Sequence, residues 1–148
     1  MNAFHDPILQ AYALSVCAVV ATLYFLGFQT ARIRAARKIV VNREDAAING
    51  GAAVGEIEHA DVQRIQRAHR NAVENAVPFF AIGFLYAMTG PGVTLARALF
   101  GVFVLVRVLH AAFYLTARQP YRTAMFAVGA LVNLAMVVQV ARAVFAAM

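Results

Sequence analysis

The sequence predicts an all-α integral membrane protein, an antiparallel bundle of four transmembrane helices, and three observations lead to this prediction. The chain of 148 residues is 62% hydrophobic and only 14% charged, which is far too apolar for an ordinary soluble domain. Four stretches of low charge are each long enough to span about 30 Å of hydrocarbon. The last two connections between them are short, and short connections make consecutive helices antiparallel neighbours. We therefore expect a single domain, residues 1–148, with helices over about residues 7–38, 61–89, 93–117 and 120–146.

The first helix is expected around residues 8–31, which contain no charged residue. No basic segment comes before it, since His5 and Asp6 precede it, and its apolar run is longer than that of a signal peptide, so we expect a retained helix. Its end continues into a basic segment, residues 32–38, and a polar loop follows. The single cysteine, Cys17, lies within the helix, where a lone cysteine predicts a packing residue and neither a disulfide nor a metal cluster.

The second helix is expected to begin near Asp61 and to carry its charges in its first half, which projects from the bilayer. Residues 75–96 then contain no charge, although Gly90, Pro91 and Gly92 end the helix before this stretch is complete.

The third and fourth helices are expected around residues 98–117 and 123–141. The third stretch is apolar apart from Arg107 and His110, whereas the fourth contains no charge. Pro120 precedes the fourth stretch and suits the first turn of a helix, because the amide hydrogen that proline lacks is unpaired there in any case.

The basic residues are distributed as in a membrane protein of defined orientation. Eight of the 13 lysines and arginines lie between residues 32 and 70, and Arg118 and Arg122 lie in the last connection, whereas Arg97 and Arg142 stand alone. By the positive-inside rule, the connections after the first and third helices face the cytoplasm, in a membrane of the bacterial inner membrane or endoplasmic reticulum type. Topology therefore accounts for the pI of about 10.3, and we expect no nucleic acid as a partner.

The start of the second helix carries a dense charged face. Its members lie within about 120° of one side of a helix, and they are Arg64, Arg67, Arg70, Asn71 and Glu74. His69 is turned away from this face. Ionisable groups at the edge of the bilayer core are costly to keep, and for this reason they mark a functional site by default. The face predicts a site for a small polyanionic ligand at the membrane surface.

The third helix carries a second polar face, in which Arg107, His110 and Tyr114 lie within about 60° of one another. An arginine inside a span needs an anion or a carbonyl as its partner, and Glu74 is the partner that we expect. Two interpretations remain open. An Arg107–Glu74 pair would only hold the bundle together, whereas the surplus of arginines that one glutamate cannot neutralise would suit a ligand with carboxylates.

Arg122 and Thr123 open the fourth helix. A positive charge next to a hydroxyl donor could stabilise a thiolate or an oxyanion, although an arginine here is also explained as a cytoplasmic anchor. No set of His, Cys, Asp and Glu residues in the sequence has the spacing of a metal site, and we expect no metal.

Several short motifs of this chain occur together in one known family. Along the second helix they are Arg67-Ala68-His69-Arg70-Asn71, Glu74-Asn75, Pro78-Phe79, Gly83-Phe84-Leu85-Tyr86 and Gly90-Pro91. Before and after that helix they are Asn42-x-Glu44-Asp45, Val106-Arg107-Val108-x-His110, Tyr114 and Pro120-x-Arg122. Together they resemble the signature of the MAPEG family, the membrane-associated proteins of eicosanoid and glutathione metabolism. The resemblance covers about residues 34–126 and is similar in pattern to the glutathione transferase and prostaglandin E synthase branches of that family.

The resemblance implies a homotrimer of four-helix subunits that binds glutathione between neighbouring subunits, in a site open to the cytoplasm. The positions that match glutathione-binding positions of the family are Arg70, Asn71, Glu74, His110, Tyr114, Arg122 and Phe126, with Arg34 contributed by the adjacent subunit. Arg67 and Arg107 match arginines that support the site.

The resemblance also implies which residues act on the thiol. Arg122 matches the arginine that holds the glutathione thiolate, and Thr123 stands where the prostaglandin synthases have a serine. Asp45 matches an acidic residue to which a catalytic role is ascribed. Phe126 stands where those synthases have a tyrosine, which argues against prostaglandin specificity.

The predicted function is that of a membrane-bound glutathione transferase, an enzyme of detoxification. It would activate the glutathione thiolate for attack on an apolar electrophile that arrives from the lipid, and the same thiolate could reduce lipid hydroperoxides as a peroxidase does. Two alternatives remain open. One is a glutathione-dependent isomerase or synthase of the prostaglandin E synthase type, and the other is a non-catalytic lipid-binding membrane protein.

Overall fold

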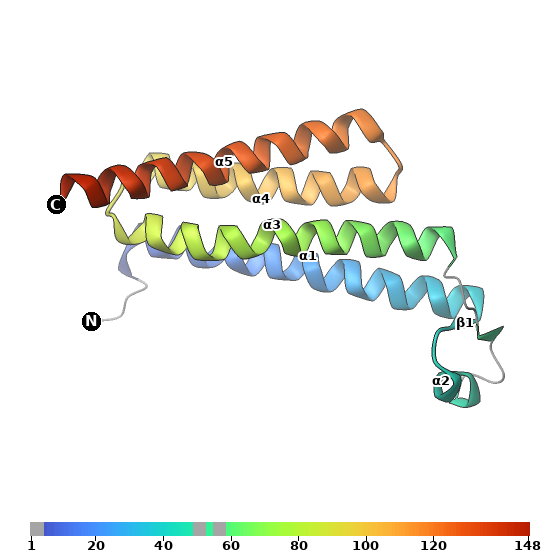
Figure 1. The fold of residues 1–148 in the computed structure, drawn as a ribbon. Coiled ribbons are helices and arrows are strands. Elements are labelled where there is room, and N and C mark those ends of the chain that lie inside the picture. Colours follow the sequence, from blue (N-terminus) through green and yellow to red (C-terminus); the bar gives the residue numbers. More distant parts are fainter. Residues whose placement is uncertain (1–4, 49–52, 55–58) are drawn as a thin grey trace.

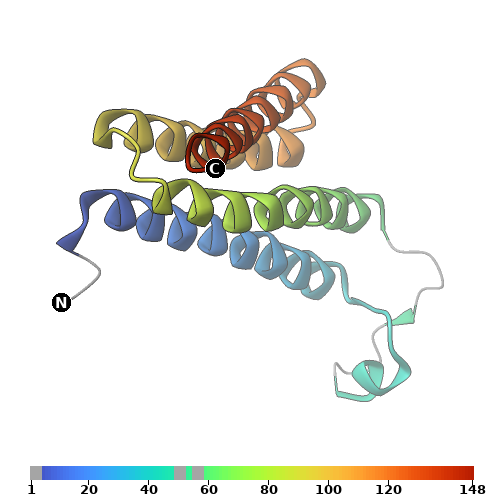
Figure 2. The same cartoon turned by 60° about the vertical axis from the view of Figure 1, so that its left-hand side comes forward.

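The computed structural model describes residues 5–48, 53–54 and 59–148 of the chain. Its four long helices are α1 (Pro7–Arg37), α3 (Ala60–Met88), α4 (Val93–Leu115) and α5 (Gln119–Ala146), and successive long helices run in opposite directions (Figure 1). Their limits differ from the expected ones by at most two residues. Figure 2 shows two layers, with α1 and α3 in one and α4 and α5 in the other.

The connection between α1 and α3 contains elements that the sequence did not predict. Where a polar loop was expected, the structure has strand β1 (Ile39–Val40), helix α2 (Arg43–Ile48) and strand β2 (Ala53–Val54). The two strands pair in parallel, and α2 lies in the crossover between them. The expected count of four helices was therefore wrong by one short helix, because elements of two to six residues are too short to show a hydrophobic period.

Aromatic side chains form the core that joins the two layers. Phe79 of α3 and Phe103 of α4 are fully buried, and their rings stack with centroids 4.0 Å apart. Tyr12 of α1 packs against the same core, and its hydroxyl donates a hydrogen bond to the carbonyl oxygen of Phe80 at 2.7 Å. This core fixes the position of the second half of α3, and thereby the direction of the polar first half.

Gly83 allows α1 and α3 to approach closely. A Cβ atom at Gly83 would lie 3.0 Å from Cε2 of Tyr12 and 3.6 Å from Cε1 of Phe100. The ring of Tyr12 has little room to give way, because its centroid lies 5.6 Å from that of Phe100 and 6.2 Å from that of Phe79.

Large hydrophobic side chains are exposed on the outer surfaces of the long helices. Three of the described helices, α1, α4 and α5, are long and apolar enough to cross a membrane, whereas α3 carries charged residues in its first half. Leu14 on α1 and Leu131 on α5 are among the large hydrophobic side chains exposed on this surface, and Cys17 is exposed on α1 as well. We therefore describe the chain as an integral membrane protein.

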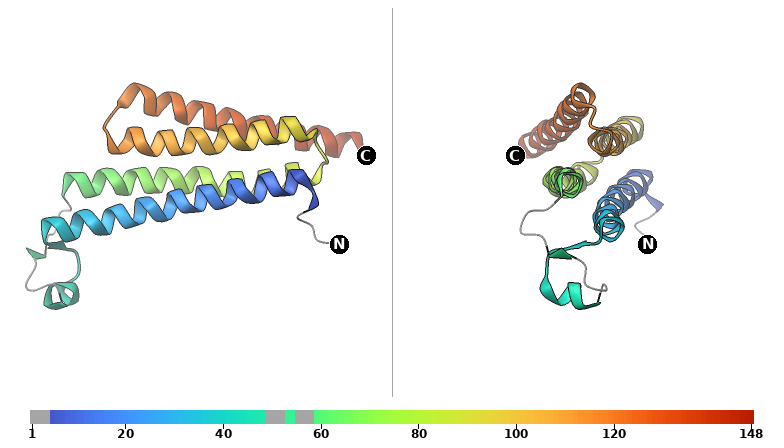
Figure 3. Two further views of the ribbon diagram at one scale, coloured as in Figure 1. Left: turned by 180° about the vertical axis from the view of Figure 1, so that it is seen from behind. Right: turned by 90° about the vertical axis from the view of Figure 1, so that its right-hand side faces the viewer.

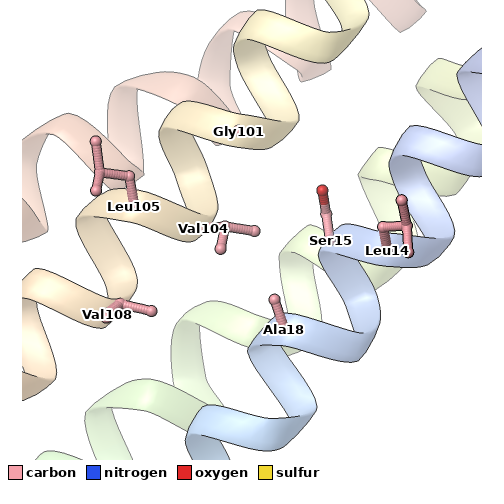
Figure 4. A pocket seen from close by; sticks show the side chains of 7 residues that line it. All are labelled: Leu14, Ser15, Ala18, Gly101, Val104, Leu105 and Val108. Atoms are coloured by element: carbon pink, nitrogen blue, oxygen red, sulfur yellow. The ribbon is translucent and has the colours of Figure 1, made fainter.

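A groove of about 360 Å³ opens on this surface between α1 and α4 (Figure 4). It is lined by Leu14, Ser15, Ala18, Gly101, Val104, Leu105 and Val108. The hydroxyl of Ser15 donates to the carbonyl oxygen of Ala11 at 2.8 Å, so its polar group is already satisfied within α1. The groove therefore presents hydrocarbon to its surroundings.

Candidate functional site

A chain of contacts between polar side chains runs from α3 through α4 to α5. It consists of Asn71, Arg107, His110, Tyr114 and Arg122, and we refer to it as the Arg107 network. Nη2 of Arg107 on α4 donates to Oδ1 of Asn71 on α3 at 2.9 Å. The same nitrogen lies 3.4 Å from Nδ1 of His110, one turn further along α4. Residues that are far apart in the sequence thus meet inside the bundle.

The network reaches α5 through an aromatic ring. The ring of Tyr114 lies edge-on to the imidazole of His110, with centroids 5.4 Å apart. The guanidinium carbon of Arg122 lies 4.2 Å from the centroid of Tyr114, which is a cation–π contact. The first turn of α5 therefore holds its arginine against α4, and Thr123 follows it as an exposed residue.

Arg107 and His110 are deeply buried, with 4% and 3% of their surfaces exposed. The side chain of Arg107 packs against α5 at Gly129, where a Cβ atom would lie 3.6 Å from Cδ of Arg107, an ordinary van der Waals contact. Within the described residues, Nη1 of Arg107 and Oδ1 of Asn133 on α5 are buried without a hydrogen-bond partner. Burying an unpaired polar group is costly. These two atoms therefore have hydrogen-bonding capacity that the described residues leave unused.

The expected partner of Arg107 was wrong. Arg107 is bonded to the amide of Asn71, whereas Glu74 is exposed and forms no ion pair within the described part of the chain. The two α3 residues are three positions apart, which separates their directions by about 60° on a helix. That rotation directs Asn71 toward α4 and leaves Glu74 to line a groove beside α1.

This second polar feature is an open groove of about 610 Å³ between α1 and α3. It is lined by Gly27, Thr30, Gln66, His69, Arg70, Val73 and Glu74. Arg70 is exposed and makes no ion pair with any described residue. The predicted charged face of the second helix is therefore divided, since Arg70 and Glu74 line this groove while Asn71 joins the Arg107 network.

Analysis of the sequence alone missed several residues of this groove. His69 was set aside because it is turned away from the charged face. The signal was nevertheless present, since Gln66, His69, Arg70 and Val73 recur at the i, i+3, i+4, i+7 spacing of one helix face. Gly27 and Thr30 of α1 also line the groove, and no spacing pattern in the sequence of α1 predicted their place there.

Arg64 and Arg67 lie outside both features. The carboxylate of Asp61 lies 3.6 Å from Nη2 of Arg64 and 2.9 Å from Nη2 of Arg37, which comes from the end of α1. The Arg37–Asp61 pair therefore fastens α1 to α3, whereas Arg64 contacts Asp61 within α3 itself. Arg67 is exposed, and its guanidinium lies 3.5 Å from the side-chain oxygen of Gln63.

The remaining predicted residues are placed as follows. Arg34 is half-buried near the end of α1, and Phe126 is exposed on α5. Asp45 accepts a hydrogen bond from Asn42 at 3.1 Å and lies on α2, which projects from the α1 side of the bundle, away from the start of α5 (Figure 3). A single chain therefore does not bring Asp45 to Arg122. Within residues 5–48, 53–54 and 59–148, no three His, Cys, Asp or Glu side chains could together hold a metal ion.

Comparison with known proteins agrees with the motifs. The MAPEG family model matches residues 12–142 of this chain. Microsomal glutathione S-transferase 1 of Rattus norvegicus is 37% identical over 141 residues, covering 93% of this chain and 91% of that protein. Prostaglandin E synthase of Macaca fascicularis is 34% identical over 139 residues, with the same coverage of 93% and 91%. Microsomal glutathione S-transferase 1 of Homo sapiens is 36% identical over 135 residues, covering 88% and 87%. The resemblance expected from the motifs is confirmed.

Proposed function

The chain belongs to the MAPEG family, and from this premise we propose that it is a membrane-bound glutathione transferase. In this proposal glutathione binds at the end of the bundle that carries the basic residues, where its thiol loses a proton. The thiolate then attacks an apolar electrophile that arrives from the bilayer. The relatives named microsomal glutathione S-transferase 1 support this activity.

The observation that carries the proposal is the position of Arg122. Its guanidinium is held over the ring of Tyr114, and no carboxylate among the described residues pairs with it. A fixed cation without a counter-ion favours the thiolate form of a neighbouring thiol, because it lowers the pKa of that thiol. The hydroxyl of Thr123, the next residue, offers a further donor to the sulfur.

The charges of the predicted face also complement glutathione, which has two carboxylates and one ammonium group. Arg67 and Arg70 are exposed and make no ion pair with the described residues, so they are available to bind carboxylates. Glu74 lines the groove beside Arg70 and could receive the ammonium group. One molecule thus carries the counter-charges that these side chains lack.

The proposed assembly is a homotrimer with glutathione between neighbouring subunits, as the resemblance implies. In one chain, Arg70 and Glu74 lie between α1 and α3, whereas the Arg107 network lies between α3, α4 and α5. These groups face different sides of α3, and a neighbouring copy would bring Arg34 and both sets around one ligand, which supports the proposed assembly. The second half of α3 would be the fourth membrane span, and the connections α1–α3 and α4–α5 would face the cytoplasm.

Equilibrium binding of labelled glutathione to the purified, detergent-solubilised protein tests the proposal, with excess unlabelled glutathione as the control. We expect saturable binding of glutathione. We also expect the rate of conjugation of an activated aryl chloride to rise with the fraction of protein that has glutathione bound. A folded, monodisperse protein that binds no glutathione would refute the proposal.

A glutathione-dependent isomerase or synthase is the second candidate, and the relatives named prostaglandin E synthase favour it. Such an enzyme returns glutathione unchanged, whereas a transferase consumes one molecule per turnover. Reduction of a lipid hydroperoxide would also consume glutathione, but it would yield the disulfide instead of a conjugate. The amount and the chemical form of glutathione after turnover therefore separate the three reactions.

A further inference from the structure

A third groove, of about 430 Å³, lies between α4 and α5 and extends to the end of α5 opposite Arg122. Its apolar lining consists of Leu95, Leu99, Leu131, Leu134, Ala135 and Val138. Gln139 and Arg142 are its polar lining residues, and both follow Val138 toward the end of α5. The groove is therefore apolar along most of its length and polar at one end.

The depth of this groove matches one leaflet of a bilayer. At about 1.5 Å per residue, the helix between Arg122 and Arg142 is about 30 Å long, which equals the thickness of the hydrocarbon core. The residues between these two arginines carry no charge. With Arg122 at one surface, Arg142 lies at head-group level on the other. The segment from Leu131 to Arg142 is then about 16 Å long, or about half of the hydrocarbon thickness.

The positive charge of Arg142 lacks a partner within the described chain. Its side chain is exposed and makes no ion pair with a described residue. Among the described residues, the side-chain carboxylate at this end of the molecule is that of Asp6, which accepts the amide hydrogens of Ile8 and Leu9 at 2.7 and 3.4 Å. No described residue therefore supplies a counter-charge to Arg142, and a phosphate matches the planar guanidinium well.

We propose that this groove binds an anionic phospholipid of the leaflet opposite Arg122. Its phosphate is bound by Arg142 and Gln139, and one acyl chain lies along the leucines of α4 and α5. An amphiphile fits this groove because the charge of an amphiphile is confined to one end of the molecule, and the polar residues of the groove also lie at one end. The guanidinium of Arg142 and the amide group of Gln139 can both donate hydrogen bonds to phosphate oxygens.

Native mass spectrometry of the detergent-solubilised protein tests the proposal with two probes, phosphatidylglycerol and phosphatidylcholine with identical acyl chains. We expect the wild-type protein to retain several-fold more phosphatidylglycerol. Arg142→Gln should bring the ratio of the two lipids close to one. The matched control is Arg97→Gln, because Arg97 is exposed near the same end of the molecule but does not line the groove. Equal retention of both lipids by the wild type, or equal effects of the two substitutions, would overturn the proposal.

A second variant tests the apolar part of the groove. Ala135→Phe would fill it, and we expect the variant to lose several-fold of both lipids while it remains monodisperse with an unchanged helical circular dichroism spectrum. Wild-type retention of both lipids by Ala135→Phe would show that the acyl chain lies elsewhere. If a second copy of the chain occupied the groove instead, Arg142→Gln would change the mass of the assembly without changing its lipid preference, and the proposal would fail.

Discussion

Arg122 is held by a different kind of contact from the arginines near the ends of α1 and α3. Arg37 and Arg64 share the carboxylate of Asp61, whereas the guanidinium of Arg122 rests on the ring of Tyr114. An aromatic ring orients a cation without cancelling its charge, so the full charge remains available to a ligand. Through Tyr114 and His110, this orientation is linked to the buried Arg107.

We expect Arg122→Ala to lower the turnover number on the order of 100-fold, because the loss of one donor to a developing anion has effects of that size. The affinity for glutathione should change much less, since other arginines bind its carboxylates. Steady-state conjugation assays and equilibrium binding measure the two quantities separately. Arg118→Ala is the matched control, because Arg118 is an exposed arginine one turn earlier. An equal loss of turnover and affinity in Arg122→Ala would contradict the assigned role.

Asn71 and Asn133 should differ in their effect on stability. Asn71→Leu removes the acceptor of the bond from Arg107 and leaves a buried cation with one partner fewer, so the free energy of unfolding should fall by about 1–3 kcal/mol. Asn133→Leu removes a buried oxygen that has no partner among the described residues, and it should be neutral or stabilising. Thermal unfolding of the ligand-free protein in detergent measures both. A loss of equal size in the two variants would argue against this account of the network.

At the scale of the elements, the long helices could be predicted from the sequence because each has a hydrophobic stretch with clear limits. Asp6 accepts the first amides of α1, and Gly90, with φ of 65°, lies just beyond the end of α3. The elements between α1 and α3 could not be predicted in the same way. Their order depends on the pairing of β1 with β2, which no local pattern reveals.

The residues of the Arg107 network could also be predicted, because arginine and histidine are rare inside an apolar helix. The sequence could not predict which of these residues would contact one another, and the wrong assignment of Glu74 as the partner of Arg107 shows why. A helical projection places both Asn71 and Glu74 on one broad face, and only the packing of α3 against α1 and α4 decides which of the two faces α4.

Two glycines allow the packing of the helices to be tested. Gly83→Ala should destabilise the protein by about 1–3 kcal/mol, because its methyl group would press against the enclosed ring of Tyr12. Gly101→Ala should stabilise it by about 0.5–1 kcal/mol, since nothing lies within 4 Å of a Cβ atom there and alanine favours a helix. Thermal unfolding in one detergent compares the two. If Gly83→Ala were as stable as Gly101→Ala, α1 and α3 would not be in the close contact described.

At the scale of the whole molecule, the division of polar groups between two sides of α3 argues for assembly. We expect the glutathione-binding form in mild detergent to have three times the chain mass of 16.0 kDa, after subtraction of bound detergent. Size-exclusion chromatography with multi-angle light scattering measures this mass. A monomer or dimer that still bound glutathione with full affinity would contradict the proposed trimer and would place the complete site within fewer chains.

The exposed Cys17 has a practical consequence for enzymology. It lies ten residues beyond Pro7 on the outer side of α1, which places its sulfur about 15 Å along the helix and within the hydrocarbon. A water-soluble disulfide reagent that titrates free thiols does not reach that depth, and the chain contains no other cysteine. The protein therefore contributes no background to a colorimetric thiol assay. In proteoliposomes, the thiols that such a reagent titrates are therefore those of glutathione, and their loss above that in an enzyme-free control measures the glutathione that the enzyme has consumed.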